Sequence, residues 1–240
     1  ARVALILAGS GEKHLSGSRF GTGASFDLDV QEGLLTTNSA MEWFGQVRVA
    51  GILAPGASLT WRPEQVEDNF MLSGELDLST GSLEMIGLNQ TALFEVSPEA
   101  VWSGRGLLVS GIGRLTGGGQ VPIELRDSAS LAVDNAGISG GIELISGTRL
   151  EFGGTGGSVG EELRLSGGTL SILEGASVST GRYVQVSGQS SGIATSIAVR
   201  DLVQISGGSM SGIGFDFHRP EAAFLSSVVP VASLAVTASP

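Results

Sequence analysis

One short phrase returns along this chain: two or three residues rich in Leu, Ile and Val, followed by Ser-Gly. Its serines stand at positions 73, 110, 146, 166, 187 and 206, which gives successive spacings of 37, 36, 20, 21 and 19. The two long spacings are about twice the short ones, and a degenerate copy at Leu125–Ser128 divides the second of them into 18 and 18. A repeat of about 18–21 residues, built of short strands and glycine turns, is typical of a solenoid.

Alternating apolar and polar residues predict short strands with one buried face. Clear examples are Phe26–Val30, Leu76–Leu78, Ile123–Leu125, Leu131–Val133 and Leu163–Leu165. Glycine makes up 38 of the 240 residues and gathers in clusters at 116–119, 153–157 and 207–209, where it permits tight corners. No window predicts a long amphipathic helix, and 62–68 and 98–102 are expected to be single helical turns inserted between coils.

We therefore expect an all-β chain folded as a right-handed parallel β-helix, with coils of about 18–21 residues stacked as one domain over 1–240. From Phe70 onward the coils are laid out at about 18 residues, the first running from Phe70 to Gly87. Dividing the chain length by a repeat of about 18.5 residues gives about 13 coils as an upper limit, and we expect about 10 to 13. Residues 1–35 and 215–240 depart from the repeat and are candidate caps or truncated neighbouring coils.

The charge of the chain excludes several classes of partner. There are 13 basic and 24 acidic residues, a formal net charge of −11, and Lys13 is the sole lysine. Without a basic cluster the chain cannot neutralise many phosphates, so neither nucleic acid nor an anionic membrane surface is an expected partner. The lack of cysteine excludes disulfides and thiolate zinc sites. No apolar run reaches the length of a membrane span, and we interpret the chain as a mature protein or a fragment of a longer one.

Two segments carry a family likeness. Gly51–Ser58, within Val47–Thr60, matches the phrase G-x-L-x-P-G-x-S and resembles the passenger domains of bacterial autotransporters and related secreted adhesins. Leu165–Leu170 is similar to the coil phrase of the same family, so the likeness extends over 47–212. The resemblance implies a right-handed parallel β-helix that is exported and displayed at the bacterial cell surface, in a family associated with adhesion and virulence.

Three functional hypotheses follow. The main one is an extracellular or cell-surface structural and adhesive solenoid, a stiff stack that presents a sheet face or the loops 62–69 and 97–105 to a partner cell, matrix or glycan. The second is a carbohydrate-active β-helix of the polysaccharide lyase, glycosidase or tailspike type. The third is a self-assembling module whose coils stack end to end into filaments or homo-oligomers.

The carbohydrate-active hypothesis needs carboxylates on one outer face. Glu124 and Glu143 are one repeat apart and precede similar Leu residues, so we expect them on adjacent coils. The other acidic candidates are Asp127, Glu162, Glu174 and Asp201, and the scattered basic ones are Arg126, Arg149 and Arg164. We favour a solvated outer face for these residues and assign no catalytic residue, because alternating strands must place polar side chains outward.

Fewer residues indicate a catalytic triad, a metal site or a sugar-binding site. His14 and His218 lie near opposite ends of the chain, and no Gly-x-Ser-x-Gly elbow is present. Gly212–Phe217 matches part of the repeat of calcium-binding β-rolls, so calcium is the one metal considered, with no defined site and no other cofactor. Trp43, Trp61 and Trp102 are expected to cap the core, with stacking on sugar rings as the alternative.

Overall fold

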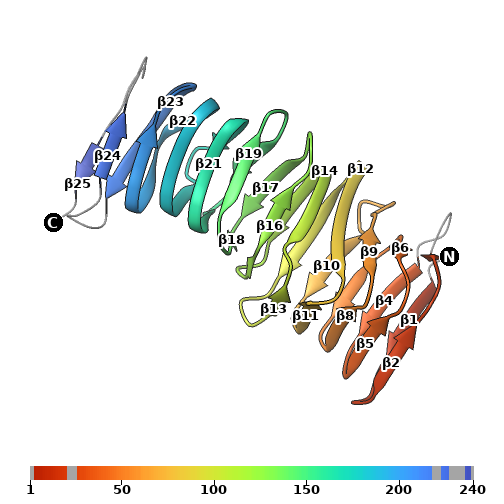
Figure 1. Ribbon diagram of the computed structural model, residues 1–240. Helices are drawn as coiled ribbons and strands as arrows, with labels where there is room; N and C mark the ends of the chain where they lie inside the picture. Colours follow the sequence, from red (N-terminus) through yellow and green to blue (C-terminus); the bar gives the residue numbers. More distant parts are fainter. Residues whose placement is uncertain (1–2, 21–25, 218–222, 227–235, 239–240) are drawn as a thin grey trace. The chain divides into compact units, whose positions relative to one another are not determined.

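The computed structural model describes residues 3–20, 26–217, 223–226 and 236–238. In these residues the regular elements are all β-strands, and parallel strands stack as a β-solenoid of about 10 turns (Figure 1). The predicted fold class is therefore confirmed. The chain forms two compact units, 1–121 and 122–240, which are described in turn. No helix in the described part is long and apolar enough to cross a membrane.

Each coil of the first unit has three strands separated by corners, so the unit has three faces. Face A consists of β1 (Val3–Leu7), β4 (Phe26–Val30), β7 (Val47–Val49), β10 (Asn69–Leu72) and the last residues of β12 (Ser82–Val96) and β14 (Leu107–Thr116). Face B consists of β2 (Glu12–Leu15), β5 (Leu34–Thr37), β8 (Ile52–Pro55), β11 (Glu75–Leu78) and β13 (Val101–Gly104). Face C consists of β3 (Arg19–Phe20), β6 (Met41–Trp43), β9 (Ser58–Trp61) and the first residues of β12 and β14, and β15 (Gln120–Val121) ends the unit.

Coil length varies in the first unit. Leu34 pairs with Ile52 on the next coil, a spacing of 18, whereas Phe70 pairs with Phe94, a spacing of 24. The coil laid out over Phe70–Gly87 is therefore too short, because loops at the corners add residues without changing how the strands stack. The segments 62–68 and 98–102 belong to such corner loops. They form turns, with strand beginning at residue 101, and the helical turns expected there are not present.

The first two Ser-Gly phrases are not equivalent positions of the coil. Ser73 follows β10 at the corner between faces A and B, whereas Ser110 pairs with Ile86 on face C. The distance between them along the sequence is therefore not two coils of the predicted length. In the expected N-terminal cap, 1–35, β1 and β2 pair in register with β4 and β5, as a neighbouring coil would.

The core of the first unit is a set of ladders of inward side chains. On face A, Phe70 stacks on Phe94 with ring centroids 4.7 Å apart and an angle of 16° between the planes. Trp61 of face C packs against Phe70 in a T-shaped arrangement, with ring centroids 5.7 Å apart. Trp43 and Trp61 are fully buried, which confirms the expected core position and rules them out as platforms for sugar rings. Trp102 is half-buried, and its indole N–H donates to the Arg105 carbonyl at 2.8 Å.

The second unit is also three-sided, with a more regular repeat. Its strands are β16 (Ile123–Leu125), β17 (Ser130–Asp134), β18 (Ala136–Ile138), β19 (Ile142–Ile145), β20 (Arg149–Phe152), β21 (Gly156–Ile172), β22 (Ser177–Ile205), β23 (Ser209–Phe217), β24 (Ala223–Ser226) and β25 (Val236–Ala238). Ser130 pairs with Arg149, a spacing of 19, and Ile142 pairs with Leu163, a spacing of 21, as predicted. Within the expected C-terminal cap, 215–240, the residues 218–222, 227–235 and 239–240 lie outside the described part.

The degenerate copy lies at the corner of the Ser-Gly phrases, but its Ser128 is equivalent to Gly147 and not to Ser146, because Ser130 pairs with Arg149 and the spacing is 19 and not the expected 18. Ser128 has a φ of +63°, and a Cβ on Gly147, whose φ is +89°, would lie 3.5 Å from the Ser128 hydroxyl. Both residues occupy the same corner on successive coils, so Ser128 holds a left-handed conformation that side chains disfavour.

Ser128→Gly is accordingly expected to raise the free energy of unfolding by about 0.5–1 kcal/mol, since relief of the left-handed strain exceeds the entropy that glycine adds to the unfolded chain. Urea unfolding followed by circular dichroism measures the change. Ser139→Gly, at a residue without positive φ, is the control and is expected to be neutral or destabilising. A loss of stability in Ser128→Gly would contradict the corner conformation.

A buried polar cluster lies inside the second unit. The Tyr183 hydroxyl donates to Gln185 Oε1 at 2.6 Å, the Ser190 hydroxyl donates to the same oxygen at 3.0 Å, and Gln185 Nε2 donates to the Ser209 carbonyl at 3.0 Å. Tyr183 and Gln185 are both fully buried. Burial raises the pKa of Tyr183 far above its ordinary value of 10.0.

This raised pKa predicts a specific loss of stability in alkali. Above pH 10.0 the unfolded chain ionises Tyr183 while the folded chain retains the proton, so unfolding becomes easier as pH rises. We expect the free energy of unfolding to fall by about 1.4 kcal/mol more per pH unit in the wild type than in Tyr183→Phe. Because the chain has a single tyrosine, its absorbance at high pH reports ionisation directly. Equal slopes for the two proteins would contradict the buried hydroxyl.

Candidate functional site

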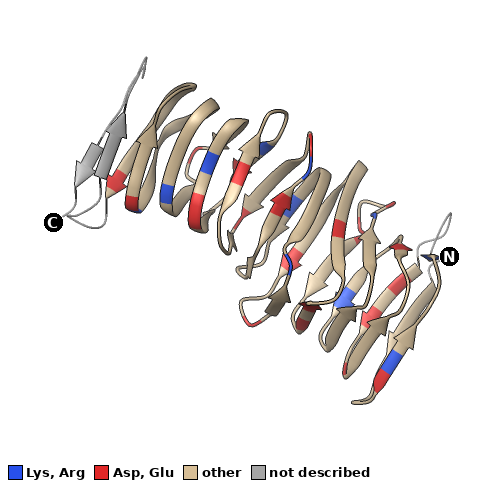
Figure 2. Ribbon diagram, viewed as in Figure 1, with Lys and Arg blue, Asp and Glu red and all other residues tan. Residues whose placement is uncertain are grey.

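The acidic residues singled out in the second unit are interleaved with arginines (Figure 2). Arg164 lies 3.4 Å from Glu143 and 3.5 Å from Glu162, and Arg182 lies 3.1 Å from Glu162. These side chains project outward, so the carboxylates form a solvated ladder of ion pairs. Such exposed pairs contribute little to stability, because water screens them and long side chains lose freedom in forming them.

Glu124 and Glu143 lie on neighbouring strands, β16 and β19, and both point outward. Glu124 has its own partner in Arg126 at 3.6 Å, and Arg149 pairs with Glu151 at 2.6 Å. The three remaining candidates occupy exposed positions: Asp127, Glu174 and Asp201. The expected solvated outer face therefore describes this surface better than a pair of catalytic carboxylates does.

His14 has neighbours that sequence reasoning missed. The Thr36 hydroxyl is 2.5 Å from His14 Nδ1, and His14 Nε2 is 3.6 Å from Glu12. The order of hydroxyl, imidazole and carboxylate is that of a catalytic triad, but the His14 and Glu12 side chains are 57% and 53% exposed on face B. Water therefore competes for each contact, and we assign the group a role in strand pairing. His218 lies outside the described residues.

The segment with the calcium-like phrase is a strand and not a loop. Gly212–Phe217 belongs to β23, where Phe215 and Phe217 point into the core and Asp216 accepts a hydrogen bond from Ser196 at 2.5 Å. Among the described residues no group of three or more His, Asp or Glu side chains is placed to hold a metal ion.

A concave feature of the first unit lies at the corner between faces A and B. Two pockets, of about 300 and 360 Å³, adjoin there and share Ala50 and Ser73 at their rims. We call them together the corner groove. It is lined by Asp29, Gly33, Arg48, Val49, Ala50, Gly51, Ile52, Met71, Leu72, Ser73, Gly74, Glu75, Glu95, Ser97, Glu99, Val101 and Gly117.

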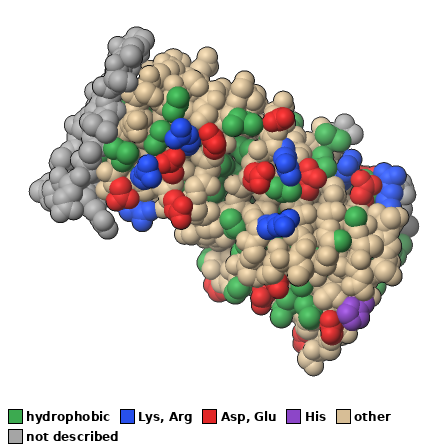
Figure 3. Space-filling view, in the orientation of Figure 1, with side chains coloured by type: hydrophobic (Ala, Val, Ile, Leu, Met, Phe, Trp, Pro, Cys, Tyr) green, Lys and Arg blue, Asp and Glu red, His purple; other side chains and the backbone are tan. Residues whose placement is uncertain are grey.

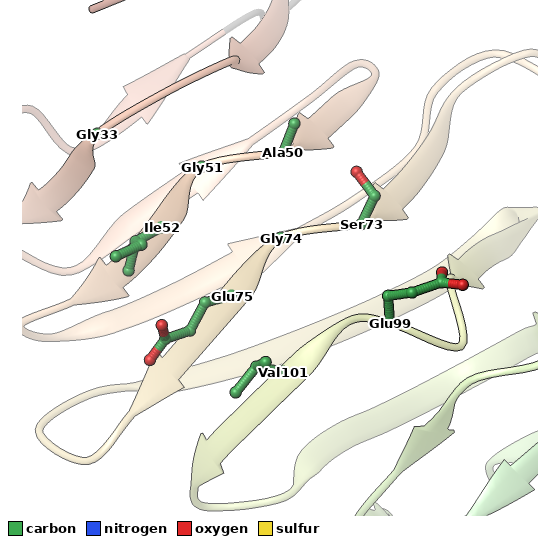
Figure 4. Close-up of a pocket in the computed structure, with 9 residues that line it drawn as sticks. All are labelled: Gly33, Ala50, Gly51, Ile52, Ser73, Gly74, Glu75, Glu99 and Val101. Carbon is green, nitrogen blue, oxygen red and sulfur yellow. The ribbon is translucent and has the colours of Figure 1, made fainter. Parts of the chain in front are cut away.

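The groove exists because two successive coils turn this corner with small residues. Only Ala50 and Gly51 separate β7 from β8, and only Ser73 and Gly74 separate β10 from β11. A Cβ on Gly51 would lie 2.7 Å from the Gly33 carbonyl oxygen, and one on Gly74 would lie 2.1 Å from the Gly51 carbonyl oxygen. Side chains are thus excluded from the floor, where the three glycines lie in line (Figure 4).

Longer corner loops flank the groove on the coils to either side, at 31–33 and 97–100. Of the corner 31–33 only Gly33 lines the groove, on its floor, and of the corner 97–100 Ser97 and Glu99 line it. The Ser97 hydroxyl donates to Glu99 at 2.5 Å, and this hydrogen bond lowers the pKa of the Glu99 carboxyl. Figure 4 shows the Glu99 carboxylate directed away from Glu75, which lies between Ile52 and Val101 on face B.

The face A side of the groove carries a row of outward side chains in register. Asp29 pairs with Arg48, Arg48 with Met71, and Met71 with Glu95, each on the next coil. Acidic and basic side chains are interspersed on the surface in view in Figure 3. The groove therefore combines a floor of glycine backbone with charged side chains beside it, a composition suited to binding and orienting a polar ligand.

One of the two expected recognition loops borders this groove. Ser97, Glu99 and Val101 of 97–105 line it. The loop 62–69 does not, and it is tied down by the buried Asp68, which accepts hydrogen bonds from the backbone N–H groups of Glu64 at 3.0 Å and Gln65 at 2.8 Å. The shortness of the Ala50-Gly51 and Ser73-Gly74 corners was the available sequence signal for the groove.

Comparison of the chain with protein-family models, curated proteins and solved structures finds no match.

Proposed function

We propose that this protein is a structural and adhesive β-solenoid that works outside the cell or at its surface and presents the corner groove to a partner cell, matrix or glycan. The observation that carries the proposal is the groove itself, an open concave surface held by hydrogen-bonded strands of four neighbouring coils. A rigid site loses little conformational entropy when a ligand binds, which favours recognition. The likeness to autotransporter passengers supports the exported location.

A steric block of the groove tests this function. Ala50 is exposed at the rim shared by the two pockets, so Ala50→Trp fills the groove without changing charge. Ala8→Trp places the same side chain at an exposed residue that lines neither pocket. Wild type and both variants are screened on glycan arrays, on matrix proteins and on peptide arrays, with a reducing-end assay of the same samples.

We expect wild type and Ala8→Trp to bind the same ligand, Ala50→Trp to lose it, and no sample to depolymerise glycans. Binding that is equal in all three proteins would overturn the groove as the recognition site. Release of reducing ends by wild type would instead support the carbohydrate-active hypothesis and direct attention to the carboxylates of the second unit. Calcium binding and assembly into homo-oligomers stay predictions, measured by titration calorimetry and light scattering.

A further inference from the structure

The charges of the corner groove point to the chemistry of its partner. Four carboxylates line it, those of Asp29, Glu75, Glu95 and Glu99, against the single guanidinium of Arg48, which gives a formal charge of −3. We propose that the groove binds an extended basic peptide segment of a partner protein. This inference rests on the proposed function of the same groove and names its ligand class. Complementary charge steers such a ligand and sets its register.

The row on face A gives the spacing of that peptide. Asp29, Arg48, Met71 and Glu95 occupy successive coils, and strands lie about 4.8 Å apart, so Asp29 and Glu95 are separated by roughly 14 Å along the stack. In an extended peptide, residues i and i+4 lie on one side and are about 13–14 Å apart. Basic side chains at i and i+4 therefore reach Asp29 and Glu95.

The residues between Asp29 and Glu95 determine which type of side chain is preferred at the middle residue of the peptide, i+2. Residue i+2 lies between Arg48 and Met71, so a positive charge there is repelled by Arg48 and an apolar side chain packs against Met71. The preferred pattern is basic-x-apolar-x-basic. Ile52 and Val101 on the face B side offer apolar surface along which the stem of a Lys or Arg can lie while its charge meets Glu75.

The carboxylates of the corner groove can accept hydrogen bonds from a basic peptide. Gln31 donates to Oδ2 of Asp29 at 2.9 Å, and an ionised carboxylate accepts further hydrogen bonds on both oxygens. Glu99 accepts from Ser97 and stays ionised to lower pH because of that bond, which lowers its pKa. Arg48 and Glu95 are exposed.

Fluorescence anisotropy with short labelled peptides tests the inference. The probe is Gly-Lys-Gly-Leu-Gly-Lys-Gly, compared with a peptide in which Glu replaces both Lys, one in which Lys replaces Leu, and a neutral hexasaccharide. The binding variant is Asp29→Asn/Glu95→Gln, which removes the two carboxylates that the Lys side chains reach. Its matched control is Glu12→Gln/Glu64→Gln, which removes two exposed carboxylates of the same unit that do not line the groove.

We expect the Lys peptide to bind wild type and the control equally, and to bind Asp29→Asn/Glu95→Gln roughly ten-fold more weakly, because each exposed ion pair contributes up to about five-fold. Binding should weaken with salt, and the Lys-for-Leu and Glu peptides should bind less well. Equal affinity of wild type for the Lys and Glu peptides would overturn the inference. A hexasaccharide that binds wild type and not Ala50→Trp, without peptide binding, would overturn the basic peptide and leave the proposed function standing.

Discussion

Phe94→Ala is expected to lower the free energy of unfolding by about 3–5 kcal/mol. Phe94 is fully buried, stacks on Phe70 at 4.7 Å, and lies 6.2 Å from the Trp102 ring. Its removal opens a cavity in a ladder of side chains on neighbouring coils, which cannot close without moving the strands. Urea unfolding monitored by circular dichroism and tryptophan fluorescence measures the loss.

The control is Phe94→Leu, which keeps most of the apolar volume and is expected to cost about 1–2 kcal/mol. Because each coil packs only on its neighbours, the loss should appear in the transition of the first unit. A Phe94→Ala protein as stable as wild type would contradict an inward-facing Phe94.

Gly111→Ala is expected to be nearly as damaging, by about 2–5 kcal/mol, for two separable reasons. Gly111 has a φ of +73°, which a side chain disfavours, and its added Cβ would lie 2.1 Å from the Gly87 carbonyl oxygen on the neighbouring coil. The methyl group therefore forces the two strands apart as well as straining the backbone.

Gly140→Ala separates these effects. Gly140 has a similar φ of +82°, but no atom lies within 4 Å of its added Cβ. It should show only the conformational part, about 1–2 kcal/mol, in the same urea titration. Equal losses in the two variants would indicate that the coils do not approach each other at Gly111 as closely as described.

The sequence predicted the second unit well because its coils are of nearly equal length. Ser166 pairs with Ser187, and the serines at 146 and 206 fall at the same corner of their coils. Regular spacing arises because the same corner of each successive coil is closed by one Ser-Gly turn. In the first unit the corners vary from the short Ala50-Gly51 to the longer 97–100, so identical phrases fall at different corners and spacing alone misplaces them.

The candidate site was harder to predict from the sequence than the fold. Asp29, Arg48 and Glu95 are far apart in the sequence and lie on neighbouring coils only once the uneven coil lengths are aligned. The rim loop 97–105 could be expected because loops of solenoids project from the stack. The groove beside it forms because the neighbouring corners consist of small residues. It can be recognised only when the pairing register of the strands on either side is known.

Photo-cross-linking from the rim of the corner groove tests most directly whether this groove is the recognition site. The chain has no cysteine, so Ser73→Cys provides a single site for a benzophenone label at the shared rim, and Ala8→Cys provides a matched site outside it. After illumination with the ligand found by screening or with the Lys peptide, mass spectrometry identifies the cross-linked chain. We predict that the ligand cross-links to position 73 and not to position 8. Cross-linking at position 8 alone, or at both positions equally, would contradict recognition in the groove.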